Sequence, residues 1–139
     1  MADSWVLDAS VAAKLCFTEC DSAEAEAAVR AAGSLVAPDL IFVELASVAA
    51  KQVRRNGVPI ETARQALVLA ETLLDEAVPL AGLMERALDF AALHGVSAYD
   101  GTYLALAQER QLPVLTADER LLRRLAERGL SQLARRVGA

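Results

Sequence analysis

The sequence has few aromatic residues, no long hydrophobic run and no leader-like start, and each shortage excludes a class of protein. Tryptophan, tyrosine and phenylalanine make up 4% of the 139 residues, so alanine, leucine and valine must build the core. The longest apolar segments, such as residues 40–43 and 77–83, are far shorter than the roughly 20 residues of a membrane-spanning helix. The N-terminus lacks the basic and apolar segments of a signal peptide. We therefore expect a cytoplasmic protein with no membrane segment.

Histidine and cysteine are too scarce for several kinds of catalytic and metal sites. His94 is the only histidine, which excludes mechanisms that need two, and no nucleophile-elbow sequence accompanies it. Cys16 and Cys20 lie four residues apart, and two such ligands do not make a zinc site. We interpret both cysteines as core or partly exposed thiols in a reducing compartment.

An excess of basic residues is also missing. The chain has 14 Lys and Arg against 19 Asp and Glu, which gives a net charge of −5. This balance argues against binding nucleic acid mainly by bulk electrostatics, but it permits binding through metal ions held by carboxylates. With 55% hydrophobic residues and a mean hydropathy of +0.30, residues 1–139 are expected to form a single domain with a sizeable core.

Short apolar segments alternate with helical patterns along the chain. The alternation predicts strands at residues 5–7, 35–37, 78–80, 113–115 and 133–137, and helices at residues 11–17, 22–33, 39–55, 59–76, 83–94, 98–110 and 117–128. Ser10 is expected to cap the first helix. Apolar strands separated by helices indicate a parallel sheet covered on both faces, so we predict an α/β sandwich. In such folds, sites lie beyond the carboxyl ends of the strands.

Three acidic residues stand where strands end or helices begin. Asp8 directly follows the first strand, and its structural interpretation is a turn or cap residue, although Ser10 is available for capping. Asp100 completes a capping-box match with Ser97. Asp118 lies within a second match at residues 116–119. Each of the three acids therefore has a structural explanation when it is considered alone.

Glu44 is a fourth acid, and it lies on the inward-facing stripe of its helix. Positions 40, 44, 47, 48 and 51 share that stripe, on which Ser47 and Val48 are expected to be buried or half-buried. A buried carboxylate is costly unless it is paired or bound to a metal. A salt bridge to Lys51 or Arg55 is the alternative, but neither lies three or four residues away.

Considered together, the four carboxylates indicate a metal site. At one end of a parallel sheet they would repel each other and raise one another's pKa. Mg²⁺ or Mn²⁺ would compensate this repulsion, because both cations prefer oxygen ligands and bind phosphate as well. We therefore predict that Asp8, Glu44, Asp100 and Asp118 bind Mg²⁺ or Mn²⁺ and that the chain hydrolyses phosphodiester bonds.

Four segments resemble the motifs of the PIN-domain nucleases, especially the VapC-type toxins of prokaryotic toxin–antitoxin pairs. They are residues 6–14 (VLDASVAAK), 38–45 (PDLIFVEL), 96–107 (VSAYDGTYLALA) and 115–121 (LTADERL). The similarity covers nearly the whole chain, in order and with family-like spacing. It implies a PIN-like, Rossmann-like three-layer α/β/α sandwich and the activity of an Mg²⁺- or Mn²⁺-dependent endoribonuclease.

The resemblance also implies roles for individual residues. The four acids would form the metal-binding pocket, and the hydroxyls of Ser10 and Thr116 would support it by hydrogen bonds. An RNA substrate, a homodimer and a cognate antitoxin that covers or enters the pocket are implied as well. Gly101 departs from the alanine that follows the acid in many relatives, which affects only the expected rigidity of that helix.

Basic residues near the acids suggest where RNA would lie. Lys14 and Arg120 each lie within two helical turns of a proposed ligand, and we expect both to contact RNA phosphates. Arg123 and Arg128 are expected to be solvated.

Other apolar and aromatic features favour packing. Tyr99 and Tyr103 are four residues apart, which favours core packing over base stacking. The apolar stripes of the helices within residues 10–31 and 60–76 would serve either a dimer face or the core.

Two other functions fit the sequence less well. A haloacid-dehalogenase-type phosphatase would have a second aspartate two residues after Asp8, where Ser10 stands. A catalytically silent PIN-like protein-binding domain is the second alternative, which would bind Mn²⁺ weakly and cleave no RNA.

Overall fold

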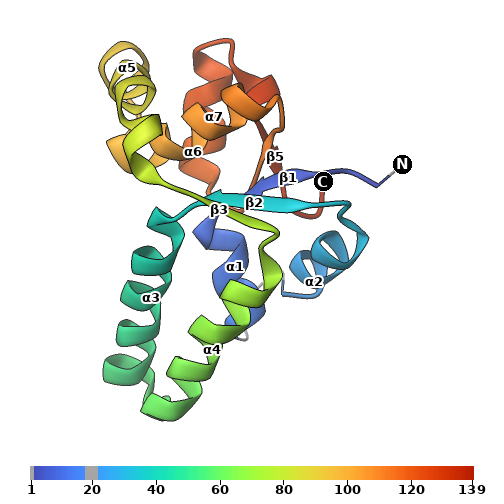
Figure 1. Cartoon of the computed structure of the whole chain (residues 1–139), viewed down its shortest axis with the longest axis vertical. Helices are drawn as coiled ribbons and strands as arrows, with labels where there is room; N and C mark the ends of the chain where they lie inside the picture. The colour runs from blue at the N-terminus through green and yellow to red at the C-terminus, as the bar shows by residue number, and fades with distance from the viewer. Residues whose placement is uncertain (1, 18–21) are drawn as a thin grey trace.

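A five-stranded parallel sheet forms the centre of the computed structural model, which describes residues 2–17 and 22–139 (Figure 1). The strands are β1 (Trp5–Leu7), β2 (Leu35–Pro38), β3 (Glu76–Val78), β4 (Val114–Thr116) and β5 (Ala134–Arg136). The helices are α1 (Ala9–Cys16), α2 (Ser22–Ala31), α3 (Leu40–Asn56), α4 (Ile60–Leu73), α5 (Met84–His94), α6 (Ala98–Arg110) and α7 (Glu119–Glu127), with short 3-10 turns η1 (Leu80–Leu83) and η2 (Ser131–Leu133).

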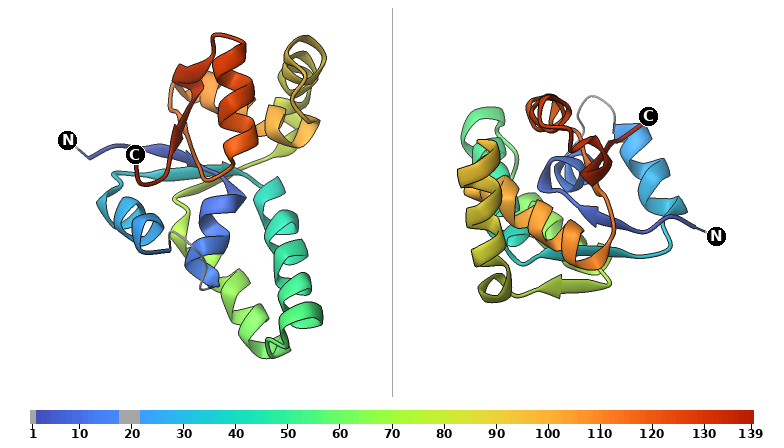
Figure 2. Two further views of the ribbon diagram at one scale, coloured as in Figure 1. Left: turned by 180° about the vertical axis from the view of Figure 1, so that it is seen from behind. Right: turned by 90° about the horizontal axis from the view of Figure 1, so that it is seen from above.

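The helices form one layer on each face of the sheet. Helices α1 to α4 cover one face and α5 to α7 cover the other, as Figures 1 and 2 show. The predicted three-layer α/β/α sandwich with a short-stranded parallel sheet is confirmed. No helix within the described residues is both long and apolar enough to cross a membrane.

The order of the strands determines where a site can form. The order is β3-β2-β1-β4-β5, so the chain winds outward from β1 through β2 to β3 and then returns to β4 on the other side of β1. The sheet therefore reverses its winding between β1 and β4, which is the topological switch point of an open α/β sheet. Val6 pairs with Val114 and Leu7 with Leu115, and this register places Asp8 beside Thr116.

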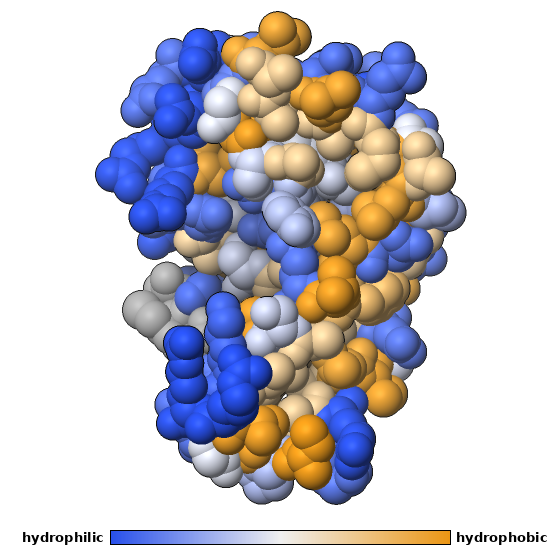
Figure 3. Space-filling view, turned by 90° about the vertical axis from the view of Figure 1, so that its left-hand side faces the viewer, coloured by the Kyte–Doolittle hydropathy of each residue, from blue (hydrophilic) through white to orange (hydrophobic). Residues whose placement is uncertain are grey.

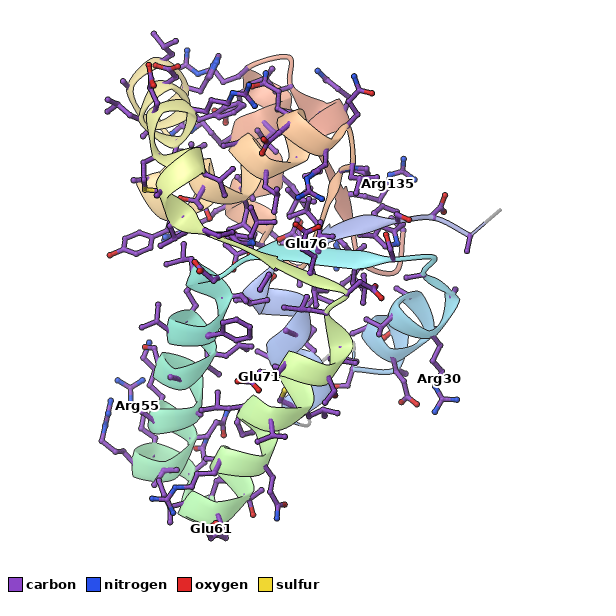
Figure 4. The ribbon with its side chains drawn as sticks, viewed as in Figure 1. Arg30, Arg55, Glu61, Glu71, Glu76 and Arg135 are labelled. Atoms are coloured by element: carbon purple, nitrogen blue, oxygen red, sulfur yellow. The ribbon has the colours of Figure 1, made fainter. Side chains whose placement is uncertain are left out.

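Wholly apolar strands explain the central core. Val6, Leu7, Val114 and Leu115 are at most 2% exposed, because helices cover both faces of β1 and β4. The edge strand β3 carries Glu76, which Figure 4 labels, and is largely exposed. Glu76 accepts two hydrogen bonds from Arg110 of α6, at 2.8 and 2.7 Å. This edge strand was predicted two residues later, at 78–80.

Pro79 explains why β3 lies two residues before the predicted strand. Pro79 has no backbone N–H to donate to the sheet, so the strand ends before it and η1 begins. The preceding helix α4 ends at Leu73 rather than at the predicted residue 76, because residues 76–78 pair with β2.

Close packing of α5 on α6 explains the unusual Gly101. A Cβ atom added to Gly101 would lie 2.6 Å from the carbonyl oxygen of Ala87, an approach that real Cβ atoms essentially never make. The glycine is therefore required by the contact between the two helices. The expectation that Gly101 affects only the rigidity of its own helix is wrong.

The predicted roles of the two cysteines have different outcomes. Cys16 is half-buried, and its thiol donates a hydrogen bond to the carbonyl of Ala66 at 3.4 Å, which fits a structural thiol. Burial raises the pKa of this thiol. Cys20 lies outside the described residues.

Candidate metal centre and active site

Asp8 lies at the carboxyl end of β1, where the sheet reverses its winding. Its backbone N–H donates to the carbonyl of Leu115 at 3.1 Å, which continues the β1–β4 pairing into the site. The residue is 8% exposed and occupies the position before the first turn of α1. Its side chain does not cap the helix, so the carboxylate is available for other partners.

Two hydroxyl groups hold the Asp8 carboxylate. Ser10 Oγ donates to Asp8 Oδ2 at 2.6 Å, and Thr116 Oγ1 donates to the same oxygen at 2.7 Å. Each hydroxyl oxygen in turn accepts a backbone N–H, from Ala117 to Ser10 Oγ and from Asp118 to Thr116 Oγ1, both at 3.0 Å. Each hydroxyl therefore donates one hydrogen bond and accepts another, and these bonds join the ends of β1 and β4.

This network corrects one prediction and agrees with another. Ser10 does not cap the first helix, which begins at Ala9 and contains Ser10 in its first turn. The serine hydroxyl instead donates to Asp8 Oδ2 and its oxygen accepts the N–H of Ala117, so the hydroxyl serves the site and not the end of the helix. Ser10 and Thr116 thus make the hydroxyl hydrogen bonds that the family resemblance implied.

Glu44 extends from α3 into the same pocket as Asp8. The carboxylate is half-buried, and its Oε1 accepts a hydrogen bond from the hydroxyl of Tyr103 at 2.7 Å. This contact replaces the salt bridge to Lys51 or Arg55 that the sequence left open. Ser47, expected to be buried or half-buried, is exposed and lines the same pocket as Glu44.

Asp100 and Asp118 approach from the first turns of two helices. The Asp100 backbone N–H donates to Ser97 Oγ at 3.0 Å, as the capping box predicted, which leaves the Asp100 carboxylate free of that role. Asp118 caps α7 directly, because its Oδ1 accepts the N–H groups of Arg120 and Leu121 at 3.0 and 3.2 Å. The cap fixes the Asp118 side chain through one oxygen.

The structure brings all four acids together around one pocket. The pocket has a volume of about 310 Å³ and is lined by Asp8, Ser10, Glu44, Ser47, Asp100 and Asp118, among other residues. Thr116 lies beneath it, fully buried. The carboxylates come from four separate segments of the chain, so only the folded protein has this site.

The pKa is raised at Asp8, Glu44 and Asp100. Burial raises the pKa of Asp8 most, the nearby Asp118 raises it further, and the two hydroxyl donors partly oppose the shift. Burial raises the pKa of Glu44, with smaller contributions from Asp8 and Asp100. The pKa of Asp100 rises to about 6, first through burial and then through Asp8 and Asp118. Among the described residues, no lysine or arginine contributes to these shifts.

The donor set fits a hard divalent cation. Four carboxylates line the pocket, and no basic group offsets the raised pKa of Asp8, Glu44 and Asp100, so a cation that prefers oxygen ligands, such as Mg²⁺ or Mn²⁺, would compensate their charge. Within residues 2–17 and 22–139, no group of three or more Asp, Glu, His or Cys side chains is already positioned to hold a metal ion. Binding would therefore draw the carboxylates inward around the ion.

The predicted phosphate contacts lie outside this pocket. Arg120 lines an adjoining cavity that also includes Asp100. Lys14 is half-buried and lines a different pocket, between α1, α2 and α4. Arg123, expected to be solvated, is exposed and lines the same cavity as Arg120. Arg55 lies at the end of α3 that is remote from the sheet (Figure 4).

The sequence did not reveal the second role of Tyr103. The prediction of core packing is correct, since the side chain is 1% exposed, but its hydroxyl also holds Glu44. The only signal was its spacing: Tyr103 follows Asp100 by three residues, so both lie on one face of α6. Tyr99, also expected in the core, is 62% exposed, so that prediction is wrong. It stands one residue before Asp100, in the first turn of α6.

Comparisons with known proteins agree on one family. Residues 5–128 match the PIN domain. A relative from Mycobacterium bovis, "VapC ribonuclease Mb0985", is 33% identical over 116 residues, which are 84% of this chain and 87% of that protein. The structure of PAE2754 from Pyrobaculum aerophilum is 21% identical with a TM-score of 0.74, over 99% of this chain and 92% of that one. A toxin–antitoxin complex from Klebsiella pneumoniae is 16% identical with a TM-score of 0.65, over 85% and 89%.

Proposed function

The chain belongs to the PIN-domain family, and from this premise we propose that it is an Mg²⁺- or Mn²⁺-dependent endoribonuclease and the toxin of a VapBC-type toxin–antitoxin pair. One observation supports the activity above all others: four carboxylates from separate segments line one pocket at the switch point of the sheet. The 33% identical relative is itself named a ribonuclease. We expect the chain to act on RNA in the cytoplasm.

The carboxylates of Asp8, Glu44, Asp100 and Asp118 would hold the metal. When bound, the cation supplies a Lewis acid for phosphate oxygens and lowers the pKa of the attacking water. Hydrolysis adds the water oxygen to phosphorus and breaks the bond from phosphorus to the leaving oxygen, which takes up a proton. Ser10 and Thr116 hold the Asp8 carboxylate and Tyr103 holds that of Glu44, so these two ligands are already oriented, although the four carboxylates would still draw inward around the ion.

A cognate antitoxin is the proposed protein partner. A pocket of about 480 Å³ between α1, α2 and α4 is lined by apolar side chains such as Leu15, Leu69 and Leu73, together with Lys14 and Glu26. Helix α1 links this pocket to the carboxylate pocket, since Asp8 precedes its first turn and Leu15 lies in its last. An antitoxin segment along α1 would therefore reach both. The Klebsiella pneumoniae structure with the same fold is a toxin–antitoxin complex.

A homodimer is the proposed assembly, and exposed apolar residues mark the face that would form it. Large hydrophobic side chains on α3, α5 and the start of α6 are exposed to solvent by 42% to 68%: Val43, Met84, Leu88, Leu93 and Tyr99. Figure 3 shows this side of the molecule, where hydrophobic residues form an interrupted stripe from top to bottom. The stripe differs from the dimer faces considered in the sequence, although Ile60, Val68 and Leu69 of α4 are also exposed.

RNA cleavage by the purified, antitoxin-free protein tests the proposed function. We expect cleavage of whole-cell RNA with Mn²⁺, none with EDTA, and none by Asp100→Asn. Cleavage that persists with EDTA or in Asp100→Asn would reject the assignment of the site. If the wild-type chain cleaves nothing under any metal, a Mn²⁺ titration separates a selective nuclease, which binds Mn²⁺, from a silent protein-binding domain, which does not.

A further inference from the structure

A second cavity adjoins the carboxylate pocket and has the opposite electrostatic character. It has a volume of about 510 Å³, and its walls are formed by α7 and by the segment that leads into α6. Asp100 lines both cavities, so they are neighbours at that residue. The charged and polar side chains of the second cavity are Ser97, Asp100, Arg120, Arg123, Arg124 and Glu127.

Three arginines in one cavity are unusual in a chain with a net charge of −5. Arg120, Arg123 and Arg124 have the spacing i, i+3 and i+4, so they lie on one face of α7. Leu121 and Leu125, 3% and 1% exposed, pack the other face of that helix into the core. This packing fixes the direction in which the arginines face, and it does not depend on any ligand.

The salt bridges around α7 leave two of these arginines uncompensated. Arg124 is paired with Glu127 at 3.4 Å, so the charges of these two residues cancel within the cavity. Glu119, at the start of the helix, is paired with Arg136 at 2.5 Å. Within the described part of the chain, the guanidinium groups of Arg120 and Arg123 form no ion pair. The remaining acid, Asp100, belongs to the set proposed to hold the metal.

We propose that this cavity binds the nucleotide next to the cleaved bond and that Arg120 and Arg123 hold its phosphate. The inference rests on the proposed function, and it assigns the substrate a direction across the site, from the carboxylates toward α7. A guanidinium group donates two parallel hydrogen bonds to phosphate, which suits a ligand that must be held in one register. The cavity lies within the usual size range of ligand sites, about 300 to 1,000 Å³.

This arrangement divides the substrate between two kinds of binding. The phosphate of the cleaved bond would contact the cation held by the carboxylates, and the adjacent phosphate would contact the guanidinium groups of Arg120 and Arg123. Contacts to phosphate position a strand without reading its bases, so the cavity would set the register of the RNA and leave sequence selection to other contacts.

The double variant Arg120→Gln/Arg123→Gln tests the proposal. Arg128→Gln is the control, because Arg128 lies just beyond the same helix and does not line the cavity. This substitution removes one positive charge, as each of the two test substitutions does. In cleavage of whole-cell RNA with Mn²⁺, we expect the double variant to raise KM about tenfold or more and to lower kcat by less. Arg128→Gln should behave as the wild type.

Binding provides a readout that does not need catalysis. In the Asp8→Asn background, anisotropy of a short fluorescein-labelled oligouridylate gives the dissociation constant at several salt concentrations. Two lost phosphate contacts on a single strand should reduce the slope of log K against log salt by about 1.4. Thermal melting of each variant checks that the fold is intact.

The two proposals can fail separately. If the wild type cleaves RNA but the double variant keeps the wild-type KM and salt slope, the cavity does not bind the substrate and the nuclease assignment stands. If Arg128→Gln had an equal effect, the weaker binding would reflect the overall charge of the chain. This outcome would also reject the cavity as the binding site. If the wild type cleaves no RNA and binds no Mn²⁺ while oligouridylate binding still depends on Arg120 and Arg123, the binding site is supported and the nuclease assignment fails.

Discussion

Tyr103 and Glu44 are 59 positions apart in the chain and are joined by a 2.7 Å hydrogen bond beside the carboxylate pocket, which Glu44 lines. The phenol comes from α6, which lies on one face of the sheet, and the carboxylate comes from α3 on the other. The tyrosine is 1% exposed, so its hydroxyl has no ready access to water as an alternative partner. The bond therefore keeps Glu44 turned toward the other three acids rather than toward solvent.

Tyr103→Phe should weaken metal binding while leaving the fold intact. The substitution removes only the hydroxyl, so the ring still fills the core, but Glu44 loses the donor that orients it. Hydrogen-bond partners of metal ligands commonly account for a 10- to 100-fold difference in metal affinity or activity, and we expect a loss of about tenfold in Mn²⁺ affinity. Isothermal titration with Mn²⁺ measures this directly.

Tyr99→Phe is the control for that experiment. Tyr99 lies on the same helix but is 62% exposed, so loss of its hydroxyl should leave Mn²⁺ affinity unchanged. Equal Mn²⁺ affinity of Tyr103→Phe and the wild type would show that Glu44 does not need this bond.

Thr116→Val should destabilise the site from beneath. Valine has nearly the same shape as threonine, but the buried Asp8 Oδ2 loses a 2.7 Å donor and the Asp118 N–H loses its acceptor. Ser10 still donates to Asp8 Oδ2, so that oxygen keeps one partner. A hydrogen bond to a charged group contributes about 1.5–3 kcal/mol, so we expect a fall of about that size in the free energy of unfolding. Urea denaturation measures the fall. Thr116→Ser keeps the hydroxyl and should keep RNA cleavage, so loss of cleavage in the serine variant would contradict this role.

Much of the fold was predictable because the central strands β1, β2 and β4 are mainly apolar and their ends are marked by polar residues. Val6 and Leu7 lead directly into Asp8, and Gly95 ends α5 in the left-handed conformation with φ near 70°. These signals lie within a few residues of each other, so a single sequence contains them. The boundaries of the predicted elements differ from those of the structure by at most three residues.

The arrangement of the site was only partly predictable, because it depends on contacts between distant segments. Asp8, Asp100 and Asp118 follow strands or begin helices, and this local signal placed them at one end of the sheet. The partner of Glu44 has no local signal, since the sequence does not show that α3 and α6 meet at the pocket. For the same reason the sequence did not show that Arg123 shares a cavity with Asp100.

Gly101→Ala should destabilise the chain, although alanine is the better helix former. The added methyl group would meet the Ala87 carbonyl oxygen at 2.6 Å, so α5 and α6 must move apart. Overpacking of this kind costs about 1–3 kcal/mol, which exceeds the gain of up to about 1 kcal/mol in helix propensity. Chemical denaturation measures the difference.

Gly82→Ala is the matched control, because nothing lies within 4 Å of a Cβ atom at that position. Gly101 directly follows Asp100, so the displaced turn of α6 should also lower cleavage activity. A Gly101→Ala chain as stable as the wild type would mean that α5 moves aside without cost.

The raised pKa of Asp100 links stability to pH. The pKa is about 6 in the folded chain, against an ordinary value of 3.8, so the folded state binds the proton more tightly than the unfolded state. Without metal, the free energy of unfolding should therefore fall as the pH rises from about 4 to about 6, and the penalty is fully present at neutral pH. A shift of this size corresponds to about 3 kcal/mol at most, and partial solvent contact of the carboxylate reduces it to about 1–2 kcal/mol.

Asp100→Asn should accordingly stabilise the metal-free chain at about pH 7 and leave its stability unchanged near pH 4, where the wild-type carboxyl is already protonated in the fold. Urea denaturation in EDTA at the two pH values measures both effects, with Asp39→Asn, an exposed acid at the start of α3, as the control. Saturating Mn²⁺ should reverse the order at neutral pH, because the cation stabilises the wild-type carboxylate and binds the variant more weakly. An asparagine variant that is less stable than the wild type at neutral pH in EDTA would show that the Asp100 charge stabilises the fold, and that the four acids do not depend on a cation to coexist.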